Sequence, residues 1–189
     1  MPDARHNEEF MQLLQPHYEQ LYRFARSMVR TRSETDDLVS ETLLAALSGF
    51  KNIKERGNFK AYLFTTASRI FKRQQWKFMR FLEFSRNNQP QDFSGETAPD
   101  VSADVALLND ALKKLPFKIR EAVTLFEISG LSMEEICAIQ GGTISGVKSR
   151  VARGRQQLAR LLEVDDSPLL KKEFLKKTRY NVTPQEVNV

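Results

Sequence analysis

Residues 131–158 read LSMEEICAIQGGTISGVKSRVARGRQQL and carry the strongest structural signal in the chain. Ser132 followed by Glu135 forms a capping box, in which the serine and the later acid each bond a free backbone amide at a helix start. The apolar residues that follow predict a short helix that ends at Gly141 and Gly142. Thr143 then caps a longer, strongly basic helix. A short helix, a glycine turn and a basic helix have the proportions of a helix-turn-helix.

The residues before this stretch extend the helical pattern. Apolar residues at helical spacing predict a helix over 105–115, a break at Pro116 and a further helix up to Gly130. Between 87 and 110 the composition changes, because Asn, Gln, Pro, Ser and Gly dominate the beginning and acids occur without any Lys or Arg. We interpret residues 87–101 as an acidic flexible linker.

The first half of the chain shows the same periodicity. Apolar residues three and four apart predict one amphipathic helix from Phe10 to Val29. Ser33 followed by Asp36 has the form of a capping box and predicts a second helix that ends at Gly49. A third helix is expected from Phe59. The sequence therefore predicts an all-α protein with two small helical domains, 1–86 and 102–163, joined by the flexible linker, with the helix-turn-helix in the C-terminal domain.

Composition narrows the class of protein. The formal net charge of +5 favours an anionic partner such as nucleic acid or a membrane surface. The first ten residues do not resemble a secretory signal, and no apolar run is long enough to span a bilayer, so we expect a cytoplasmic protein. The single cysteine, Cys137, argues against disulfides and a cysteine-cluster metal site, and His6 and His17 lack the spacing of ligands. We expect no metal and no cofactor.

Two charged clusters fall in the first half. Asp36, Asp37 and Glu41 lie near a helix start, where the helix dipole alone would stabilise each acid by roughly 0.3 to 1 kcal/mol. Residues 69–86 contain six cations, one acid and interleaved aromatic residues. Basic side chains can bind the phosphates of a single nucleic-acid strand, and aromatic rings can stack on its unpaired bases. This segment therefore suits the binding of single-stranded nucleic acid. For three of its phenylalanines we favour packing against the domain or a partner: Phe78, Phe81 and Phe84.

Three stretches together resemble the extracytoplasmic-function sigma factors, which keep only regions 2 and 4 of the sigma-70 family. Residues 34–47, ETDDLVSETLLAAL, are similar to region 2.2, and residues 59–73, FKAYLFTTASRIFKR, are similar to regions 2.3 and 2.4. Residues 112–158 are similar to region 4, whose helix-turn-helix alone is shared with many transcription factors. The resemblance implies a protein that is not an enzyme, and that binds core RNA polymerase and directs promoter-specific initiation through −10 and −35 elements.

The resemblance also implies roles for single residues. The acidic helix would dock on the clamp helices of the polymerase largest subunit, while region 4 would reach the flap. The residues implied in polymerase binding are Asp36, Asp37, Leu38, Val39 and Glu41. Those implied at the −10 element, with the loop at 50–58, are Lys60, Arg69, Lys72, Arg73 and Trp76. Those implied at the −35 element are Thr143, Lys148, Ser149, Arg150, Ala152, Arg153 and Arg155.

Within the −35 group, the first positions of a recognition helix reach base edges and the flanking cations meet phosphates. We therefore expect Lys148, Ser149, Ala152 and Arg153 at bases, and Arg150 and Arg155 at phosphates. The chain departs from the family pattern at Gly142, Ser145 and Gly146, where an apolar residue and a Gly-Thr pair are usual, so no promoter sequence is carried over. Promoter DNA and an anti-sigma factor are further implied partners.

Other classes of protein account for less of the sequence. An enzyme lacks support, because the chain has no phosphate-cradling glycine loop and no nucleophile motif. A two-domain helix-turn-helix regulator would leave the acidic helix and the basic aromatic helix unexplained. An antagonist that mimics sigma surfaces would not need an intact recognition helix. We expect Cys137 to be a structural thiol, and residues 164–189 form an extension without an assigned role.

Overall fold

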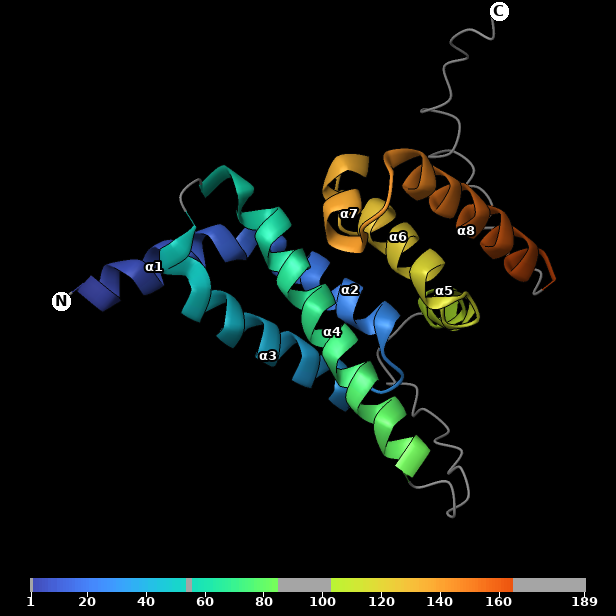
Figure 1. Cartoon of the computed structure of the whole chain (residues 1–189), viewed down its shortest axis with the longest axis horizontal. Helices are drawn as coiled ribbons and strands as arrows, with labels where there is room; N and C mark the ends of the chain where they lie inside the picture. Colours follow the sequence, from blue (N-terminus) through green and yellow to red (C-terminus); the bar gives the residue numbers. More distant parts are fainter. Residues whose placement is uncertain (1, 54–55, 85–102, 165–189) are drawn as a thin grey trace, which may run out of the picture.

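The structure, a computed structural model, describes residues 2–53, 56–84 and 103–164, and every regular element in those ranges is a helix (Figure 1). The first half contains α1 (Pro2–Leu14), η1 (Gln15–His17), α2 (Tyr18–Met28), α3 (Arg32–Gly49), η2 (Phe50–Asn52), η3 (Arg56–Asn58) and α4 (Phe59–Phe84). The second half contains α5 (Ala103–Lys113), α6 (Phe117–Glu127), α7 (Met133–Gln140) and α8 (Ile144–Val164). The predicted all-α class is confirmed. The predicted linker at 87–101 and the extension after 164 lie outside the described residues.

Aromatic side chains hold the first half together. Phe24 of α2 meets Phe64 of α4 edge to face, with ring centroids 5.6 Å apart. Phe50 makes edge contacts with Phe10 at 5.3 Å and with Phe59 at 5.8 Å. Edge-to-face contact suits the charge distribution of aromatic rings, so each pair adds to the hydrophobic gain of burial. The cluster fixes α4 against α1, α2 and the η2 turn that follows α3.

Two details of the first half differ from the sequence prediction. The single helix predicted over 10–29 is divided by η1, because Pro16 lacks an amide proton and its ring interferes with the preceding turn. The capping box predicted at Ser33 and Asp36 was wrong. Thr31 is the cap: its Oγ1 accepts from the Glu34 amide at 3.1 Å, and the Glu34 carboxylate accepts from the Thr31 amide at 3.0 Å. The predicted end at Gly49 and the start at Phe59 are confirmed.

The helix-turn-helix forms as the sequence predicts. Ser132 and Glu135 make the capping box of α7, and Gly141 and Gly142 have φ angles of 74° and 94°, a conformation that favours glycine. Thr143 Oγ1 accepts from the Gly146 amide at 3.1 Å and so caps α8. The expected break at Pro116 is also confirmed.

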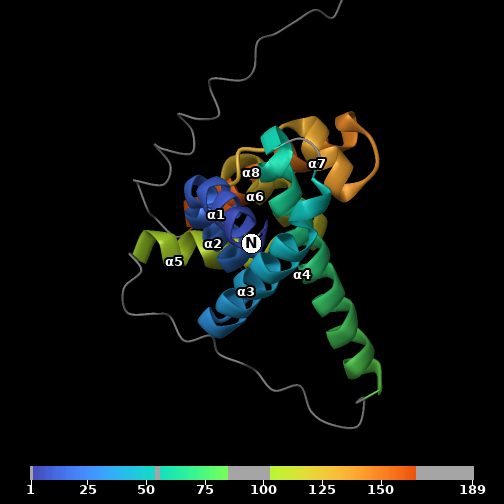
Figure 2. The same cartoon turned by 90° about the vertical axis from the view of Figure 1, so that its left-hand side faces the viewer.

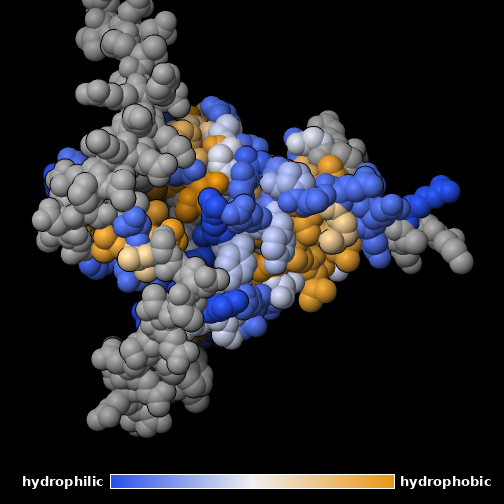
Figure 3. Space-filling model, turned by 180° about the vertical axis from the view of Figure 1, so that it is seen from behind, coloured by the Kyte–Doolittle hydropathy of each residue, from blue (hydrophilic) through white to orange (hydrophobic). Residues whose placement is uncertain are grey.

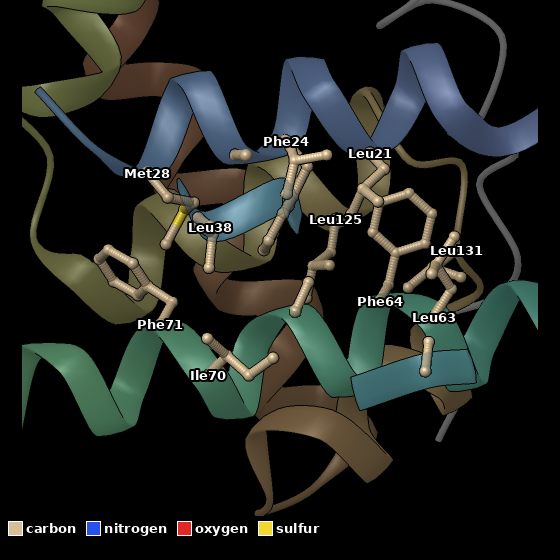
Figure 4. Close-up of a cluster of buried hydrophobic side chains, with 14 of the residues drawn as sticks. Leu21, Phe24, Met28, Leu38, Leu63, Phe64, Ile70, Phe71, Leu125 and Leu131 are labelled. Carbon is tan, nitrogen blue, oxygen red and sulfur yellow. The ribbon is translucent and has the colours of Figure 1, made fainter. Parts of the chain in front are cut away.

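The two halves pack against one another and share a core. Helices α2 and α4 contact α5, α6 and α7. Leu125 of α6 and the following Leu131 belong to the same buried cluster as Phe24 and Phe64 (Figure 4). A second, smaller cluster holds α5, α6 and α8 together and contains Leu112, Leu115, Val123, Leu158 and Leu162. The sequence predicted two helical units, and the structure shows that they are in contact.

The surface is mixed in character. From behind, hydrophilic side chains cross the middle of the molecule and hydrophobic ones gather in separate patches (Figure 3). Among the helices that the structure describes, none has the length and apolar character to cross a membrane. The C-terminal part of α4 projects beyond the other helices in both ribbon views (Figure 2).

Candidate functional site

The acidic residues of α3 form an exposed surface. Asp36, Asp37 and Glu41 are all exposed, whereas Leu38 and Val39 are in the core, with 0% and 3% of their surface accessible. The expectation that Leu38 or Val39 offers apolar contact to a partner is corrected accordingly, because both side chains pack inside the chain. Sequence reasoning missed Leu44, which is 67% exposed. Its spacing of seven residues from Asp37 would have placed it on the acidic face.

Glu41 connects this acidic surface to α4. Its carboxylate accepts a hydrogen bond from Gln74 Nε2 at 2.9 Å and lies 3.5 Å from Arg73 Nη2. Both charged side chains are about half exposed, so solvent screens the pair and its contribution to stability is about 0–1 kcal/mol. The geometry brings one predicted polymerase-binding acid beside one predicted DNA-binding cation.

The exposed part of α4 carries a basic and aromatic stripe. Arg69, Arg73, Trp76 and Arg80 are exposed and follow one another at intervals of four, three and four residues, which places them on one side of the helix. Trp76 is 73% exposed. Phe78 is 54% exposed, so of the two expected contacts, with its own domain or with a partner, the structure does not show the first, and the second stays a prediction. The side chains of Phe81 and Phe84 lie outside the described residues.

The other two residues predicted at the −10 element, Lys60 and Lys72, lie at the contact between the halves. Lys60 Nζ donates to the Gly130 carbonyl at 2.9 Å. Lys72 Nζ lies 3.2 Å from the Glu121 carboxylate and 3.4 Å from the Ile139 carbonyl. The charge of Lys60 also acts on His17, whose pKa is lowered first by burial and then by this lysine. The predicted −10 residues therefore divide into an exposed stripe and two lysines engaged with the second half.

The helix-turn-helix presents a basic face on α8. Lys148, Ala152 and Arg153 are exposed and Ser149 is half-buried, while Val147 and Val151 pack inside. The four residues predicted at base edges occupy adjacent positions on successive turns of the helix, so the structure brings them together. Thr143 is exposed at the start of the same helix. This arrangement fits the insertion of a helix into the major groove.

Arg150 and Arg155 have partners within the chain. Arg155 Nε donates to Glu127 at 2.6 Å, and its guanidinium lies 5.2 Å from the centroid of the Phe126 ring. Arg150 Nη2 donates to the Gly141 carbonyl at 3.4 Å. Both side chains thus help to hold α8 on α6 and α7. Sequence reasoning missed Glu127, because 28 residues separate it from Arg155 and no local pattern links them.

Cys137 and His17, the remaining residues singled out in the sequence, have contacts within the chain. Cys137 is half-buried and its thiol donates to the Gly142 carbonyl at 3.3 Å. No group of three or more potential metal ligands occurs among residues 2–53, 56–84 and 103–164. His17 packs near the Phe59 ring, with centroids 6.4 Å apart.

Comparison with known proteins gives consistent matches along the chain. Residues 13–77 match the family model for sigma-70 region 2, and residues 106–158 match the one for sigma-70, region 4. The ECF RNA polymerase sigma factor EcfG of Rhodopseudomonas palustris is 34% identical over 142 residues, which cover 75% of this chain and 78% of that protein. The RNA polymerase sigma factor CnrH of Cupriavidus metallidurans is 29% identical over 168 residues, which cover 82% and 87%.

Solved structures show the same arrangement. The sigma factor RpoE in complex with the anti-sigma factor NepR, from Bartonella quintana, has a TM-score of 0.73 and 34% identity, over 84% of this chain and 99% of that one. CnrH in complex with the cytosolic domain of CnrY has a TM-score of 0.62 and 26% identity, over 87% and 96%. The similarity covers both halves in the same order.

Proposed function

Because this chain belongs to the sigma-70 family, as an extracytoplasmic-function sigma factor, we propose a role for each of its exposed surfaces. The chain binds core RNA polymerase and directs promoter-specific initiation, as its relatives do. The family is not catalytic, and we propose that polymerase supplies all of the chemistry. The units that act are residues 1–86 and 102–163. Since the partner enzyme is cytoplasmic, the chain acts there.

The acidic surface of α3 docks on the clamp helices of the polymerase largest subunit. Asp36, Asp37 and Glu41 supply negative charge, and complementary charge speeds the encounter and sets its orientation. Leu44 supplies the apolar contact, because it is the exposed large hydrophobic side chain beside these acids. Leu38 and Val39 act from within, by holding α3 on the core. Region 4 contacts the flap of the same enzyme.

The stripe on α4 holds the −10 element. Trp76 is exposed at 73% and offers a ring face, and stacking of an unpaired base on an aromatic residue is worth about 1–3 kcal/mol. Arg73 and Arg69 lie about one and two turns before it, where they can follow the phosphates of the same strand. The proposed −10 surface also includes the segment 50–58, of which the structure describes 50–53 and 56–58, and Lys60 and Lys72 join it.

The basic face of α8 reads the −35 element in the major groove. Lys148 and Arg153 donate to base edges, while Ser149 and Ala152 allow close approach of the helix. Arg150 and Arg155 contact phosphates with the N–H groups that their intramolecular partners leave available. The Thr143 hydroxyl accepts from the Gly146 amide and donates its proton to a phosphate at the helix start.

The single observation that carries this proposal is the presence of an exposed acidic surface and an exposed base-reading helix on one chain. A regulator that binds only duplex DNA does not need the acidic surface of α3. A protein that mimics sigma surfaces does not need the base-reading helix α8. An anti-sigma factor is a further partner, since the solved RpoE that this chain resembles is in complex with the anti-sigma factor NepR.

Reconstituted transcription tests the proposal. Core polymerase without a sigma factor is given a promoter library with and without the purified chain, and run-off products are sequenced. We expect specific start sites that depend on the chain, together with co-purification of the chain with core enzyme. A chain that binds duplex operators alone and ignores polymerase would instead be a conventional regulator.

A further inference from the structure

Ile144 is an exposed apolar side chain at the first position of α8. It is 39% exposed, and neither of the two buried clusters of the described residues includes it. Residues 141–146 read GGTISG, so Ile144 is the one large side chain in this stretch. A single exposed apolar residue needs no explanation on most of a surface, but this one begins the helix that we assign to the major groove. Its methyl groups are accordingly available to DNA that meets the start of α8.

Hydrogen bonds hold the start of α8 in a fixed conformation. The Thr143 hydroxyl accepts from the Gly146 amide at 3.1 Å. Arg150 donates from Nη2 to the Gly141 carbonyl at 3.4 Å, which ties the preceding turn to the second turn of the helix. An isoleucine in a helix also has one strongly preferred χ1 rotamer. Ile144 is therefore presented in a defined direction, and contact with DNA would cost it little conformational entropy.

The small residues around Ile144 let DNA come close to it. Gly142 and Gly146 have no side chain, and a Cβ at Gly146 would lie 3.3 Å from Thr143 Oγ1. In a helix each Cα–Cβ bond tilts toward the N-terminus, so the side chain of the first residue projects toward the helix start. Lys148 follows one turn later on the same side of the helix and is also exposed. The start of α8 thus carries an apolar side chain just ahead of its first base-reading cation.

An apolar side chain at this place distinguishes one base from the others. In the major groove, thymine presents a C5 methyl group, while the other base edges present hydrogen-bond donors and acceptors without one. The Ile144 side chain has no group that can form a hydrogen bond. Against a polar edge it would displace water and leave donors or acceptors unpaired, which is unfavourable. Against thymine it gains the burial of a methyl group.

We propose that Ile144 is a specificity-determining residue that reads the methyl group of a thymine in the −35 element. The inference rests on the proposed role of α8 at that element. Ile144 lies about 6 Å before Lys148 along the helix, so this thymine lies within about two base pairs of the one that Lys148 contacts. Removal of the thymine methyl should weaken binding about fourfold, which corresponds to about 0.8 kcal/mol, the value of one buried carbon of this kind.

Deoxyuridine in place of thymine tests the inference, because it removes the C5 methyl group and keeps the base pairing. A promoter selected from the run-off library is prepared with each −35 thymine replaced in turn, and transcription by the holoenzyme is measured. With the wild-type chain, one replacement near the start of α8 should lower initiation about fourfold. With Ile144→Ala the thymine and deoxyuridine promoters should be used equally at that position. Ile144→Val, which keeps a β-branched side chain, should retain most of the preference.

Val105→Ala is the matched control, because it shortens another exposed β-branched side chain, on α5. It should respond to each replacement as the wild type does, and all variants should keep native melting temperatures because the altered side chains are exposed. An unchanged response of Ile144→Ala to deoxyuridine, or a selected −35 element without thymine, would overturn the inference. Specific initiation with no effect of the methyl group would leave the proposed function standing and reject the inference alone. A wild-type chain that gives no specific start site would reject both.

Discussion

Arg155 of α8 is paired with Glu127 of α6 and lies over the neighbouring Phe126 ring. The two charged side chains are 19% and 17% exposed, so the pair is largely shielded from water. This contact fixes α8, the recognition helix, on α6. Lys148 and Arg153 of the same helix are exposed. Arg155 therefore holds the recognition helix on α6, and the N–H groups that Glu127 leaves available are the ones proposed to contact a phosphate.

The double variant Lys148→Ala with Arg153→Ala should abolish initiation at the cognate promoter and leave polymerase binding intact. Each good base contact is worth about 1–3 kcal/mol, so affinity for the −35 element should fall on the order of 100-fold. Run-off transcription and co-purification with core enzyme measure the two effects separately. Gln156→Ala, at another exposed position of α8, is the control. Loss of polymerase binding in the double variant would refute the assigned roles.

Asp37→Arg should impair binding to core polymerase and leave binding to promoter DNA intact. The substitution places a cation in the exposed acidic surface of α3, where it would repel basic side chains on the polymerase. Co-purification with core enzyme should fall at least tenfold, while binding of the isolated chain to −35 duplex should stay unchanged. Glu8→Arg makes the same change of charge at an exposed site on α1 and serves as the control. Normal co-purification of Asp37→Arg would count against the docking surface.

Gly154→Ala should destabilise the second half. Gly154 is buried where α8 crosses α6, and an added Cβ would lie 2.2 Å from Val123 Cγ2 and 2.9 Å from Ile119 Cγ2. Overpacking of this kind typically costs about 1–3 kcal/mol, which urea unfolding would measure. Gly57→Ala is the control, because its Cβ would meet nothing within 4 Å. Val123→Ala should partly restore the stability of Gly154→Ala, and a loss that Val123→Ala leaves untouched would point to a different cause.

The free energy of unfolding should decrease in mild acid because His17 becomes protonated more easily in the unfolded chain. Burial, and next the charge of Lys60, lower the pKa of His17 below its ordinary value of 6.5 in the folded chain. The unfolded state therefore takes up the proton first, so the stabilisation is present above the ordinary pKa and is lost as the pH falls through it toward the folded value. Melting temperatures between about pH 7.5 and pH 5 should decrease less for His17→Gln than for the wild type. Parallel decreases in both proteins would contradict this assignment.

Local patterns were sufficient for much of the fold and for the nature of the surfaces. The caps at Ser132 and Thr143, the helix ends at Gly49 and Gly141, and the break at Pro116 follow from short-range rules of backbone bonding and steric fit. The sequence also identified the acidic cluster of α3 and the strongly basic helix α8 from residues that are close together in the chain. These features depend on neighbours within a few residues, so one sequence suffices to predict them.

Contacts between residues far apart in the sequence determined how the helices pack and which side chains are buried. Ser68 and Glu121 are 53 residues apart and Lys60 and Gly130 are 70 residues apart, and no local rule says that they meet. Periodicity shows that a helix has an apolar face, but several surfaces of similar character can cover it. Leu38 and Val39, which the family resemblance implied at an interface with polymerase, lie in the core. Burial of apolar area carries no direction, and so the contact between the halves, with the engagement of Lys60 and Lys72, emerges only when the whole chain is packed.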